Sequence, residues 1–293
     1  ITITPDPIAN LTSDATADTI CAGDTIIITA DPVAGATYTF ELNGAPVPAG
    51  QVVANVYTTS AITAESTVEV TVTSAGGCSD TDTITVLVPL LATAGTVTLN
   101  AADAGHCTGA TIANDITVNA AATLDAAASA GSALTYQWQL RNTTTGNLWQ
   151  DIVGATSDLF DVSATPLNIT EDTQIRRLTY ASLNTVDCPT NGLPSNVVSI
   201  DVEDPRDPTI TVNPGTSVCR DDVDGLVFTV NTINTQATDT YQWYRNGAAI
   251  GGATNTTYSP ALDTDINDGD TITVIVTTVA PDSCTFTSAG TLI

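Results

Sequence analysis

Three stretches of the chain share one pattern: ATYTFELNGAPV at 36–47, LTYQWQLRNTTT at 134–145 and DTYQWYRNGAAI at 239–250. Each stretch places a tyrosine two residues before a large aromatic residue and then continues into a polar turn. Alternating apolar and polar residues are typical of a strand with one buried face. The repetition indicates three copies of one structural unit.

Each copy is framed by two cysteines and by further short strands. A cysteine and an alternating segment precede the aromatic pair, and another segment leads to a second cysteine, as in VEVTVTSAGGC at 68–78. Short strands separated by turns, in units of about 80 to 110 residues, predict an all-β chain of three tandem Ig-like antiparallel β-sandwich domains. The expected domains span 8–91, 92–204 and 205–293, and residues 1–7 are expected to form a strand that completes a neighbouring domain.

The aromatic residues of the motif are expected to lie between the two sheets of each sandwich. An indole or phenyl ring fills a volume that no aliphatic side chain fills. A ligand platform is the alternative, but recurrence at one place in every unit is typical of a core. The expected core residues are Tyr38, Phe40, Tyr136, Trp138, Tyr241 and Trp243.

The composition supports β structure and excludes several partners. The 293 residues are rich in Thr, Val and Ile, which favour pleated surfaces, and the basic residues are six arginines without any lysine. With 32 acidic residues the formal net charge is −26. Such a surface repels phosphate backbones and anionic lipid, so neither nucleic acid nor a membrane surface is an expected partner. It suits a soluble extracellular surface, or one that collects divalent cations.

The chain carries signs of an extracellular location. It has no apolar run of 18 residues, so no membrane span is expected. The absence of an initiator methionine and of a signal peptide indicates a processed product or an excised piece. Six cysteines, an even number spread along the chain, indicate disulfides formed in an oxidising compartment, outside the cell or at its surface.

Several segments resemble the Ig-like repeats of giant surface adhesins and extracellular filament proteins of Bacteroidota. They are ICAGDTIIITA at 20–30, YTFELNG at 38–44, VEVTVTSAGGC at 68–78 and YQWYRNG at 241–247, and with their counterparts in the middle unit they cover most of the chain. The resemblance implies secretion, often by the type IX system, and a role as a stalk or filament in adhesion or gliding.

The same resemblance implies O-glycosylation at Asp-Thr-Ile triplets. The alternative is that each triplet is an ordinary entry from a turn into a strand. The implied sites are Thr19, Thr25, Thr83 and Thr271.

All six cysteines are expected to form disulfides. The repeated arrangement favours pairing inside each unit, namely Cys21 with Cys78, Cys107 with Cys188, and Cys219 with Cys284. A disulfide requires Cα atoms within about 7 Å. In an Ig topology, however, a cysteine before the second strand and one in the last turn can lie at opposite ends of the domain. Pairing between domains is therefore the alternative.

The residue inventory argues against catalysis. Nucleophile and base pairs need a base, and the chain has one histidine, His106, and no lysine. The acidic residues contain no pair that stands out as a glycosidase pair. No enzymatic activity and no catalytic residue are expected.

Calcium is the one possible cofactor, because it is a hard cation that takes about six to eight oxygen ligands. The segment DTDINDGD at 263–270 offers Asp263, Asp265, Asn267, Asp268 and Asp270. At the boundary between the second and third domains, DVEDPRDP at 201–208 offers Asp201, Glu203 and Asp204. The alternatives are a solvated turn at the first site and pairing of the acids with Arg206 at the second.

The two ends of the chain complement each other. The last unit continues from Cys284 only through TFTSAGTLI, whereas the chain begins with ITITPDP at 1–7; joined, they form a full alternating strand and a linker. Either the chain is one period of a covalent tandem array, or it forms a donor-strand polymer; an accidental boundary is the third reading. The donor strand would consist of Ile1, Thr2, Ile3, Thr4 and Pro5, and would cover an exposed strand edge. Both of the first two arrangements give open head-to-tail contacts and hence a fibre.

The first hypothesis is therefore a structural subunit or segment of a bacterial extracellular filament or adhesin stalk, whose partner is another copy of itself. The alternative is a glycan- or protein-binding Ig-like module of a secreted multidomain protein, with a cell-surface or glycan ligand. Exposed aromatic residues favour such a module, and Trp149, in GNLWQD, is the tryptophan that lies outside the core pattern.

Overall fold

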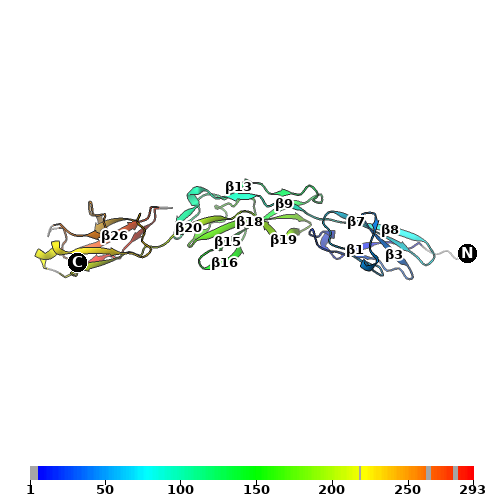
Figure 1. The fold of residues 1–293 in the computed structure, drawn as a ribbon, viewed down its shortest axis with the longest axis horizontal. Coiled ribbons are helices and arrows are strands. Elements are labelled where there is room, and N and C mark those ends of the chain that lie inside the picture. Colours follow the sequence, from blue (N-terminus) through cyan, green and yellow to red (C-terminus); the bar gives the residue numbers. More distant parts are fainter. Residues whose placement is uncertain (1–5, 218, 262–264, 280–282) are drawn as a thin grey trace.

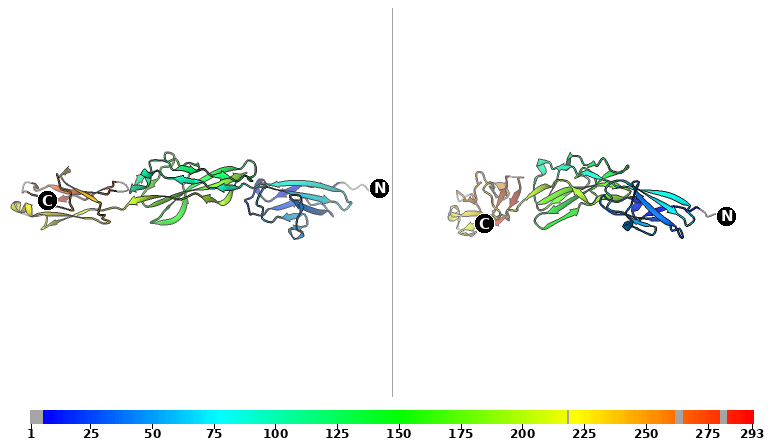
Figure 2. Two further views of the ribbon diagram at one scale, coloured as in Figure 1. Left: turned by 45° about the horizontal axis from the view of Figure 1, so that its top comes forward. Right: turned by 45° about the vertical axis from the view of Figure 1, so that its right-hand side comes forward.

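Three β-sandwich units lie in a row along the molecule (Figure 1). The computed structural model describes residues 6–217, 219–261, 265–279 and 283–293. The N-terminal end lies at one tip and the third unit at the other, and the turned views show the same extended shape (Figure 2). Nearly all strand pairs are antiparallel, and the described ranges contain no α-helix. The predicted fold class, an all-β chain of tandem Ig-like sandwiches, is confirmed.

The first unit contains two sheets of four strands, ordered β1-β2-β6-β5 and β4-β3-β7-β8. Two short 3-10 helices lie in its connections. Its elements are β1 (Leu11–Ser13), η1 (Thr16–Asp18), β2 (Ile27–Ala30), β3 (Thr37–Leu42), β4 (Ala45–Pro46), η2 (Ala49–Gln51), β5 (Val52–Val53), β6 (Val56–Thr58), β7 (Ser66–Thr73) and β8 (Ser79–Val86).

The second unit has one large sheet, ordered β11-β20-β18-β15-β16 with β19 beside β18, and three two-stranded ladders, β10-β13, β12-β17 and β9-β14. Its elements are β9 (Leu91–Thr93), β10 (Thr96–Thr98), η3 (Ala101–Asp103), β11 (Gly105–Cys107), β12 (Ala110–Thr111), β13 (Thr117–Ala120), β14 (Thr123–Leu124), β15 (Ala133–Asn142), β16 (Gly146–Asp151), β17 (Asn168–Ile169), β18 (Thr173–Leu183), β19 (Val186–Pro194) and β20 (Val198–Glu203).

The third unit repeats the two-sheet plan, with orders β21-β22-β25 and β24-β23-β26-β27 and with β28 also beside β26. Its elements are β21 (Thr209–Asn213), η4 (Arg220–Gly225), β22 (Val227–Asn231), β23 (Thr240–Arg245), β24 (Ala248–Ala249), β25 (Thr257–Tyr258), β26 (Thr271–Thr277), β27 (Thr285–Thr287) and β28 (Thr291–Leu292).

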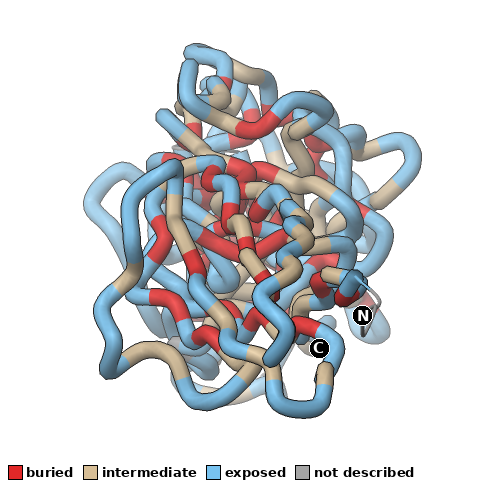
Figure 3. The backbone as a smooth tube through the Cα atoms, turned by 90° about the vertical axis from the view of Figure 1, so that its right-hand side faces the viewer, coloured by how far each residue is buried: buried red, intermediate tan, exposed pale blue. Residues whose placement is uncertain are grey.

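One aromatic side chain occupies the centre of each sandwich, and the three are called here the central aromatic residues: Phe40, Trp138 and Trp243. They are 3%, 0% and 0% exposed. Each packs against a second buried ring, with centroid distances of 5.6 Å, 5.5 Å and 6.0 Å to Tyr57, Phe160 and Tyr258 respectively. Buried residues therefore run through the middle of the molecule in the view along its long axis (Figure 3).

The buried indoles also satisfy their polar atoms. Trp138 Nε1 donates to the Ser157 carbonyl at 2.8 Å, and Trp243 Nε1 donates to the Asn255 carbonyl at 2.9 Å. A buried N–H without a partner costs free energy, so these bonds allow a tryptophan to replace the phenylalanine of the first unit.

The units have separate hydrophobic cores. The buried clusters lie within 11–88, 97–200 and 223–276, inside the three expected domains. The expected boundary between residues 91 and 92 falls within β9, which pairs with β14 of the second unit. The connection between the first two units is therefore itself part of a sheet.

Candidate functional site: the two domain junctions

Both disulfides join neighbouring units. Cys21 bonds to Cys188 with a Cα–Cα distance of 5.3 Å, and Cys107 bonds to Cys284 with a Cα–Cα distance of 5.5 Å. The pairing expected inside each unit, Cys21 with Cys78, Cys107 with Cys188 and Cys219 with Cys284, is wrong. The alternative of pairing between domains holds for these four cysteines, whereas Cys78 and Cys219 belong to neither bond.

Strand direction explains this pairing. We call Cys21, Cys107 and Cys219 the first cysteines and Cys78, Cys188 and Cys284 the second cysteines of the three units. The last strand of each of the first two units, β8 or β20, runs toward the next unit. The segment before that strand contains the second cysteine and therefore lies at the opposite end of the unit. The first cysteine lies beside the far end of the last strand: Cys107 is the parallel register partner of Glu203 in β20. The two cysteines of a unit therefore stand at opposite ends, and each meets a neighbouring unit instead.

The junction between the first and second units is closed by hydrogen bonds as well as by the Cys21–Cys188 disulfide. Val88 N donates to Ser129 Oγ at 2.8 Å, and Ser129 N donates to the Val88 carbonyl at 3.1 Å. On the other side, Asn184 Nδ2 donates to Thr19 Oγ1 at 2.9 Å. Asn184 lies in the two-residue turn between β18 and β19, where it has a positive φ of 52°, a conformation that asparagine adopts more readily than most residues.

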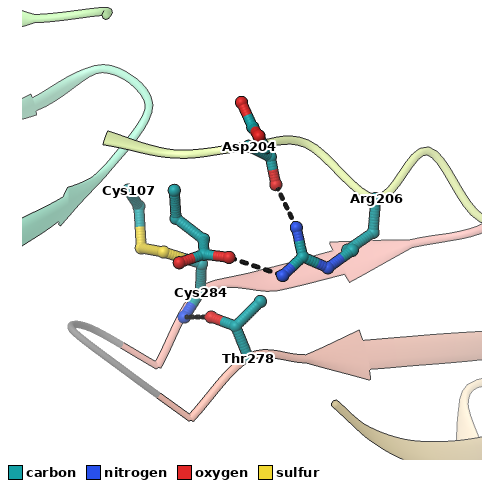
Figure 4. The surroundings of a disulfide bond; sticks show 6 residues. Cys107, Asp204, Arg206, Thr278 and Cys284 are labelled. Atoms are coloured by element: carbon teal, nitrogen blue, oxygen red, sulfur yellow. Dashed lines mark hydrogen bonds and ion pairs between the residues drawn. A yellow bond between two sulfur atoms is a disulfide. The ribbon is translucent and has the colours of Figure 1, made fainter. Parts of the chain in front are cut away.

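The junction between the second and third units is built around Arg206. This side chain is 0% exposed and lies beside the Cys107–Cys284 disulfide (Figure 4). Its Nε donates to Asp239 Oδ2 at 2.8 Å, its Nη1 donates to the Asp204 carbonyl at 2.7 Å, and its Nη2 donates to Glu203. Because Glu203 ends the second unit and Asp239 belongs to the third, one guanidinium ties the two units together.

Electrostatics reinforce this cluster. The hydrogen bond to Asp239 raises the pKa of Arg206 above its ordinary value, against the opposing effect of burial. Burial acts most strongly on Asp239 and would raise its pKa, but hydrogen bonds from Arg206 and from the Gln236 backbone outweigh it, so the pKa of Asp239 lies below its ordinary value. The pair is therefore fully ionised at neutral pH.

Two of the three residues expected at the second calcium site, Glu203 and Asp204, take part in this junction. Glu203 is paired with Arg206, and Asp204 offers Arg206 its backbone carbonyl. Asp201 is exposed in β20. Pairing with Arg206, the alternative given by the sequence, describes Glu203 and Asp204.

The described acids of the first expected calcium site have different hydrogen-bond partners. Asp263 lies outside the described residues. Asp270 is buried and accepts from Asn246 Nδ2 at 2.6 Å and from Asn267 N at 2.8 Å, Asp265 Oδ2 accepts from Ala261 N at 2.9 Å, and Asp268 is exposed. Across the ranges that the structure describes, no three His, Cys, Asp or Glu residues are grouped so that they could hold a metal.

The four threonines implied as glycosylation sites differ in exposure. Thr19 is 3% exposed and bonds to Asn184 inside the first junction, so its hydroxyl is not presented to solvent. Thr271 is half-buried in β26. Thr25 and Thr83 are exposed.

Of the expected core tyrosines, Tyr38 and Tyr241 pack against the edges of their clusters, and Tyr136 stacks on Arg177. Tyr38, Tyr136 and Tyr241 are half-buried, whereas the central aromatic residues two positions later are buried. The expected donor strand, Ile1, Thr2, Ile3, Thr4 and Pro5, lies outside the described residues.

The single histidine belongs to the packing of the second unit. His106 is buried next to Asp103, with 3.6 Å between Nε2 and Oδ1. Asp103 accepts hydrogen bonds from the backbone of Ala113 and from Asn114. The neighbouring Cys107 is held in a disulfide and supplies no thiolate.

Sequence reasoning missed a buried arginine, Arg177, in the core of the second unit. It is 0% exposed, donates from Nη1 to the Asp158 carbonyl at 2.7 Å and from Nη2 to the Ala94 carbonyl at 2.9 Å, and stacks 4.5 Å from the Tyr136 ring. The signal was present in the alternation of TQIRRLTYASL, which puts residues 175, 177, 179 and 181 on one face.

A cationic and aromatic cluster lies at the half-buried surface of the second unit. The Arg141 and Arg176 guanidinium groups lie 4.7 Å and 4.1 Å from the centroid of the Trp149 ring. A separate hollow of about 530 Å³ on this unit is lined by the tyrosines Tyr136 and Tyr180 and by one leucine, Leu134. The other lining residues are polar, namely Thr135, Gln137, Asp151, Thr156 and Asp187. In the described parts of the chain, no helix is long and apolar enough to cross a membrane.

Comparison with known proteins gives fold neighbours only. No protein-family model matches the chain, and no curated protein matches it. Among solved structures, it is similar to the I67–I69 fragment of titin, with 10% identity, 98% of each chain covered and a TM-score of 0.41. It is also similar to a 1.5-MDa bacterial ice-binding adhesin, with 15% identity, 98% of this chain and 96% of that chain covered, and a TM-score of 0.29. Fibronectin(III)-like modules of Clostridium thermocellum CbhA match at 10% identity over 66% of this chain and 93% of theirs, with a TM-score of 0.33.

Proposed function

We propose that the chain is a load-bearing segment of a bacterial extracellular filament or adhesin stalk, and that copies of it join head to tail. The observation that carries this proposal is the construction of the two internal junctions. Each is closed by a disulfide together with hydrogen bonds or a buried ion pair. A series of sandwiches locked in this way resists bending as well as carrying tension, whereas flexible linkers would carry tension but let the units bend freely.

The last strand of the third unit supports the head-to-tail contact. In the second unit, β20 pairs with β18 on one side and with β11 on the other. In the first unit, Leu87 bridges to Thr19 in the same parallel manner. Among the described residues of the third unit, β28 pairs with β26 alone. A further strand that continues the line of β28 would therefore extend the sheet beside β26.

The donor of that strand is the segment ITIT at the start of a second copy. Backbone hydrogen bonds along an added strand supply affinity, and alternate side chains supply specificity. In such a strand Ile1 and Ile3 would face the core of the third unit of the neighbour, while Thr2 and Thr4 would face solvent. The first unit already holds its own strand from Ala9 onward, because Ala9 N donates to Asp80 at 2.9 Å and Leu11 N donates to Asp82 at 2.7 Å.

Negative-stain microscopy of the purified chain tests the proposal. Filaments with a repeat of three domains are expected. Ile1→Asp with Ile3→Asp should abolish them, and the matched variant Thr2→Asp with Thr4→Asp should retain them, because a charge on the solvent face is tolerated. Discrete monomers of the unmodified chain, or equal behaviour of the two variants, would overturn the donor strand.

A denaturing, reducing gel of material from the natural source separates the two ways of joining copies. A band at 30.0 kDa indicates donor strands between separate chains. A far larger band indicates a covalent tandem array of the same units.

Glycosylation of the exposed sites Thr25 and Thr83 accompanies this proposal. Sugars there would decorate the outside of the rod without entering a junction. Intact-mass measurement of the natural protein should show added hexoses, and a mass equal to that of the polypeptide alone would exclude them.

A second candidate is glycan binding by the middle unit, favoured by the hollow beside Tyr136 and Tyr180. Tyrosine rings at a hollow with carboxylate and amide groups suit the faces and hydroxyls of a sugar. Tyr180→Ala should then abolish retention on a glycan column while leaving filaments intact. Retention that is equal for the variant and the unmodified chain would exclude this role.

A further inference from the structure

The second cysteine occupies one register position in all three units. The central aromatic residues pair across the sheet with Val70, Arg177 and Val274. In every unit, the residue four positions after this valine or arginine lies opposite the second cysteine. These register pairs are Ser74 with Cys78 (N–H to carbonyl, 2.8 Å), Ala181 with Cys188, and Thr278 with Cys284 (N–H to carbonyl, 3.0 Å).

The first cysteine also occupies a similar position in all three units. It lies seven or nine residues before the residue that pairs with the second buried ring of the core. Those pairs are Ile28 with Tyr57 after Cys21, Ile116 with Phe160 after Cys107, and Phe228 with Tyr258 after Cys219. Cys219 and Cys78 therefore stand where the other units carry bonded cysteines.

The internal junctions follow one rule: the first cysteine of a unit bonds to the second cysteine of the unit that follows. Cys21 with Cys188 and Cys107 with Cys284 are two independent instances, with Cα–Cα distances of 5.3 Å and 5.5 Å. Under this rule Cys219 would bond to the second cysteine of a following unit, and Cys78 would bond to the first cysteine of a preceding unit. A second copy placed head to tail provides both partners with one bond.

The placement of the two residues at the tips of the rod fits this partner. β8 runs from the turn that contains Cys78 toward the second unit, so that turn faces away from the rest of the molecule. The 3-10 helix η4, whose N-cap is Cys219, lies at the opposite tip, in the yellow part of the ribbon in Figure 1. Cys219 is exposed, Cys78 and the bonded Cys107 are half-buried, and the bonded Cys21, Cys188 and Cys284 are 8%, 3% and 2% exposed.

The surface around Cys219 resembles an internal junction from which one partner has been removed. At the first junction, Cys21, Ala22 and Asp24 face Pro189, Thr190 and Leu193 across a cleft of about 340 Å³. Around Cys219, an open hollow of about 490 Å³ is lined by Pro214, Ser217, Asp222, Asp224 and Gly225. A turn of the β7–β8 type from a second copy would supply the opposite wall.

We propose that Cys219 of one copy and Cys78 of the next form an intermolecular disulfide, so that head-to-tail filaments are covalently continuous. This inference rests on the head-to-tail contact proposed above and names the bond that seals it. The same orientation and spacing that close the two internal junctions would close the contact between copies.

The chemistry requires an oxidant, and a small disulfide such as oxidised glutathione supplies it by exchange. The Cys219 thiolate attacks one sulfur of the oxidant, and the first glutathione thiolate leaves. The Cys78 thiolate of the next copy then attacks the Cys219 sulfur of the mixed disulfide and expels the second glutathione thiolate. The two protein thiols lose two protons and two electrons in total, and the oxidant is reduced to two thiols.

The test is a denaturing, non-reducing gel of the full chain incubated with oxidised glutathione. The unmodified chain should form a ladder of multiples of 30.0 kDa that collapses to one band on reduction. Cys219→Ser and Cys78→Ser should each give only the monomer. A mixture of the two variants should give one dimer band and nothing larger. One chain then supplies only Cys219 and the other only Cys78, so neither can bond to a third chain.

A matched control separates a directed contact from random oxidation. Cys219→Ser with Thr144→Cys keeps the number of cysteines but moves one to the exposed turn between β15 and β16. This variant should fail to form the ladder. Three results would each overturn the proposal. They are dimers of Cys78→Ser alone, which require a Cys219–Cys219 bond, a ladder from the control, and no ladder from the unmodified chain.

Microscopy of the same samples distinguishes this proposal from the proposed function. Filaments that form equally well from the variant lacking Cys78 and Cys219 would support head-to-tail assembly and show that the disulfide is not needed for it. A specific ladder made of short, irregular particles would support the disulfide and overturn the filament.

Discussion

Among the residues that the structure describes, Arg177 and Arg206 are fully buried, and each is held by a different set of partners. Arg177 donates to two backbone carbonyls and stacks on Tyr136 inside one core. Arg206 joins carboxylates from two neighbouring units. Guanidinium groups suit both places because they offer several donors in a planar fork and are more weakly hydrated than ammonium groups. A buried ion pair is costly to break from one side only, since the remaining charge is left without compensation.

The central aromatic residues are expected to carry more of the stability than the exposed tryptophan. Trp243→Ala should lower the free energy of unfolding of the third unit by about 3 to 5 kcal/mol, because it removes a fully buried ring and leaves a cavity. Trp149→Ala, on the half-buried surface of the second unit, is the matched control and should cost clearly less. Urea unfolding followed by circular dichroism measures both, and equal losses would contradict the assignment of Trp243 to the core.

The junction between the second and third units is expected to weaken in acid. The folded pKa of Asp239 lies below its unfolded value of about 4, so its ionised form stabilises the junction above that pH. This contribution is lost as the pH falls through the folded pKa, because the proton then binds the folded state as well. The unfolding temperature of the third unit should therefore fall as the pH drops below about 4.

The variant Asp239→Asn checks the origin of that acid sensitivity. It should be less stable than the unmodified chain at pH 7, because Arg206 loses its ion-pair partner, and its unfolding temperature should change less over the acid range. Asp268→Asn, which removes an exposed carboxylate of the same unit, is the control and should keep the full acid dependence. An acid transition that is identical in all three proteins would show that Asp239 is not its source.

At the scale of the elements, the interdomain disulfides are expected to hold units together without being needed to fold them. Cys107→Ser with Cys284→Ser should leave the far-ultraviolet circular dichroism unchanged, because each unit has its own core. Removal of one such constraint should lower the stability of the junction by about 2 to 4 kcal/mol.

Small-angle X-ray scattering and limited proteolysis measure that change. The variant should show a wider distribution of maximum dimensions and faster cleavage in the linker at 204–208. The corresponding change at the other junction, Cys21→Ser with Cys188→Ser, is the matched comparison. Loss of sheet signal from the third unit would contradict the view that the bond acts only between units.

The strands and their repetition could be predicted from local patterns, because the alternation of apolar and polar residues in YQWQL or ITVIV depends only on neighbours in the sequence. The all-β fold and the Ig-like architecture followed from that repetition. The disulfide partners could not be predicted in the same way. They depend on which end of a sandwich each cysteine occupies and on which unit stands next to that end, and both are properties of the assembled rod.

The cluster around Arg206 could not be predicted for a related reason. Sequence alone shows a group of acids next to one arginine, but the acid that completes the cluster, Asp239, lies 33 residues beyond Arg206. Only the folding of the third unit brings its carboxylate to the junction.

At the scale of the whole molecule, charge is expected to govern how readily copies meet. Each copy has a formal net charge of −26, so two approaching copies repel each other. Raising the ionic strength from about 0.01 M to about 0.15 M shortens the Debye length from about 30 Å to about 8 Å and should speed association. Light scattering gives the initial rate of assembly, and sucrose at equal osmolarity is the control. A rate that falls with salt would mean that the contact between copies is dominated by opposite charges.

The two disulfides also give the chain a particular covalent connectivity, because they overlap along the sequence. One closes a ring from Cys21 to Cys188 and the other a ring from Cys107 to Cys284. Every peptide bond between Cys21 and Cys284 lies inside at least one ring, so hydrolysis of any single one leaves the two ends of the molecule joined. Even two cuts fail to part them. Separation needs three cuts, one in each interval between successive bonded cysteines, at 21–107, 107–188 and 188–284. A rod exposed to proteases therefore keeps its length after damage that would sever an ordinary string of domains.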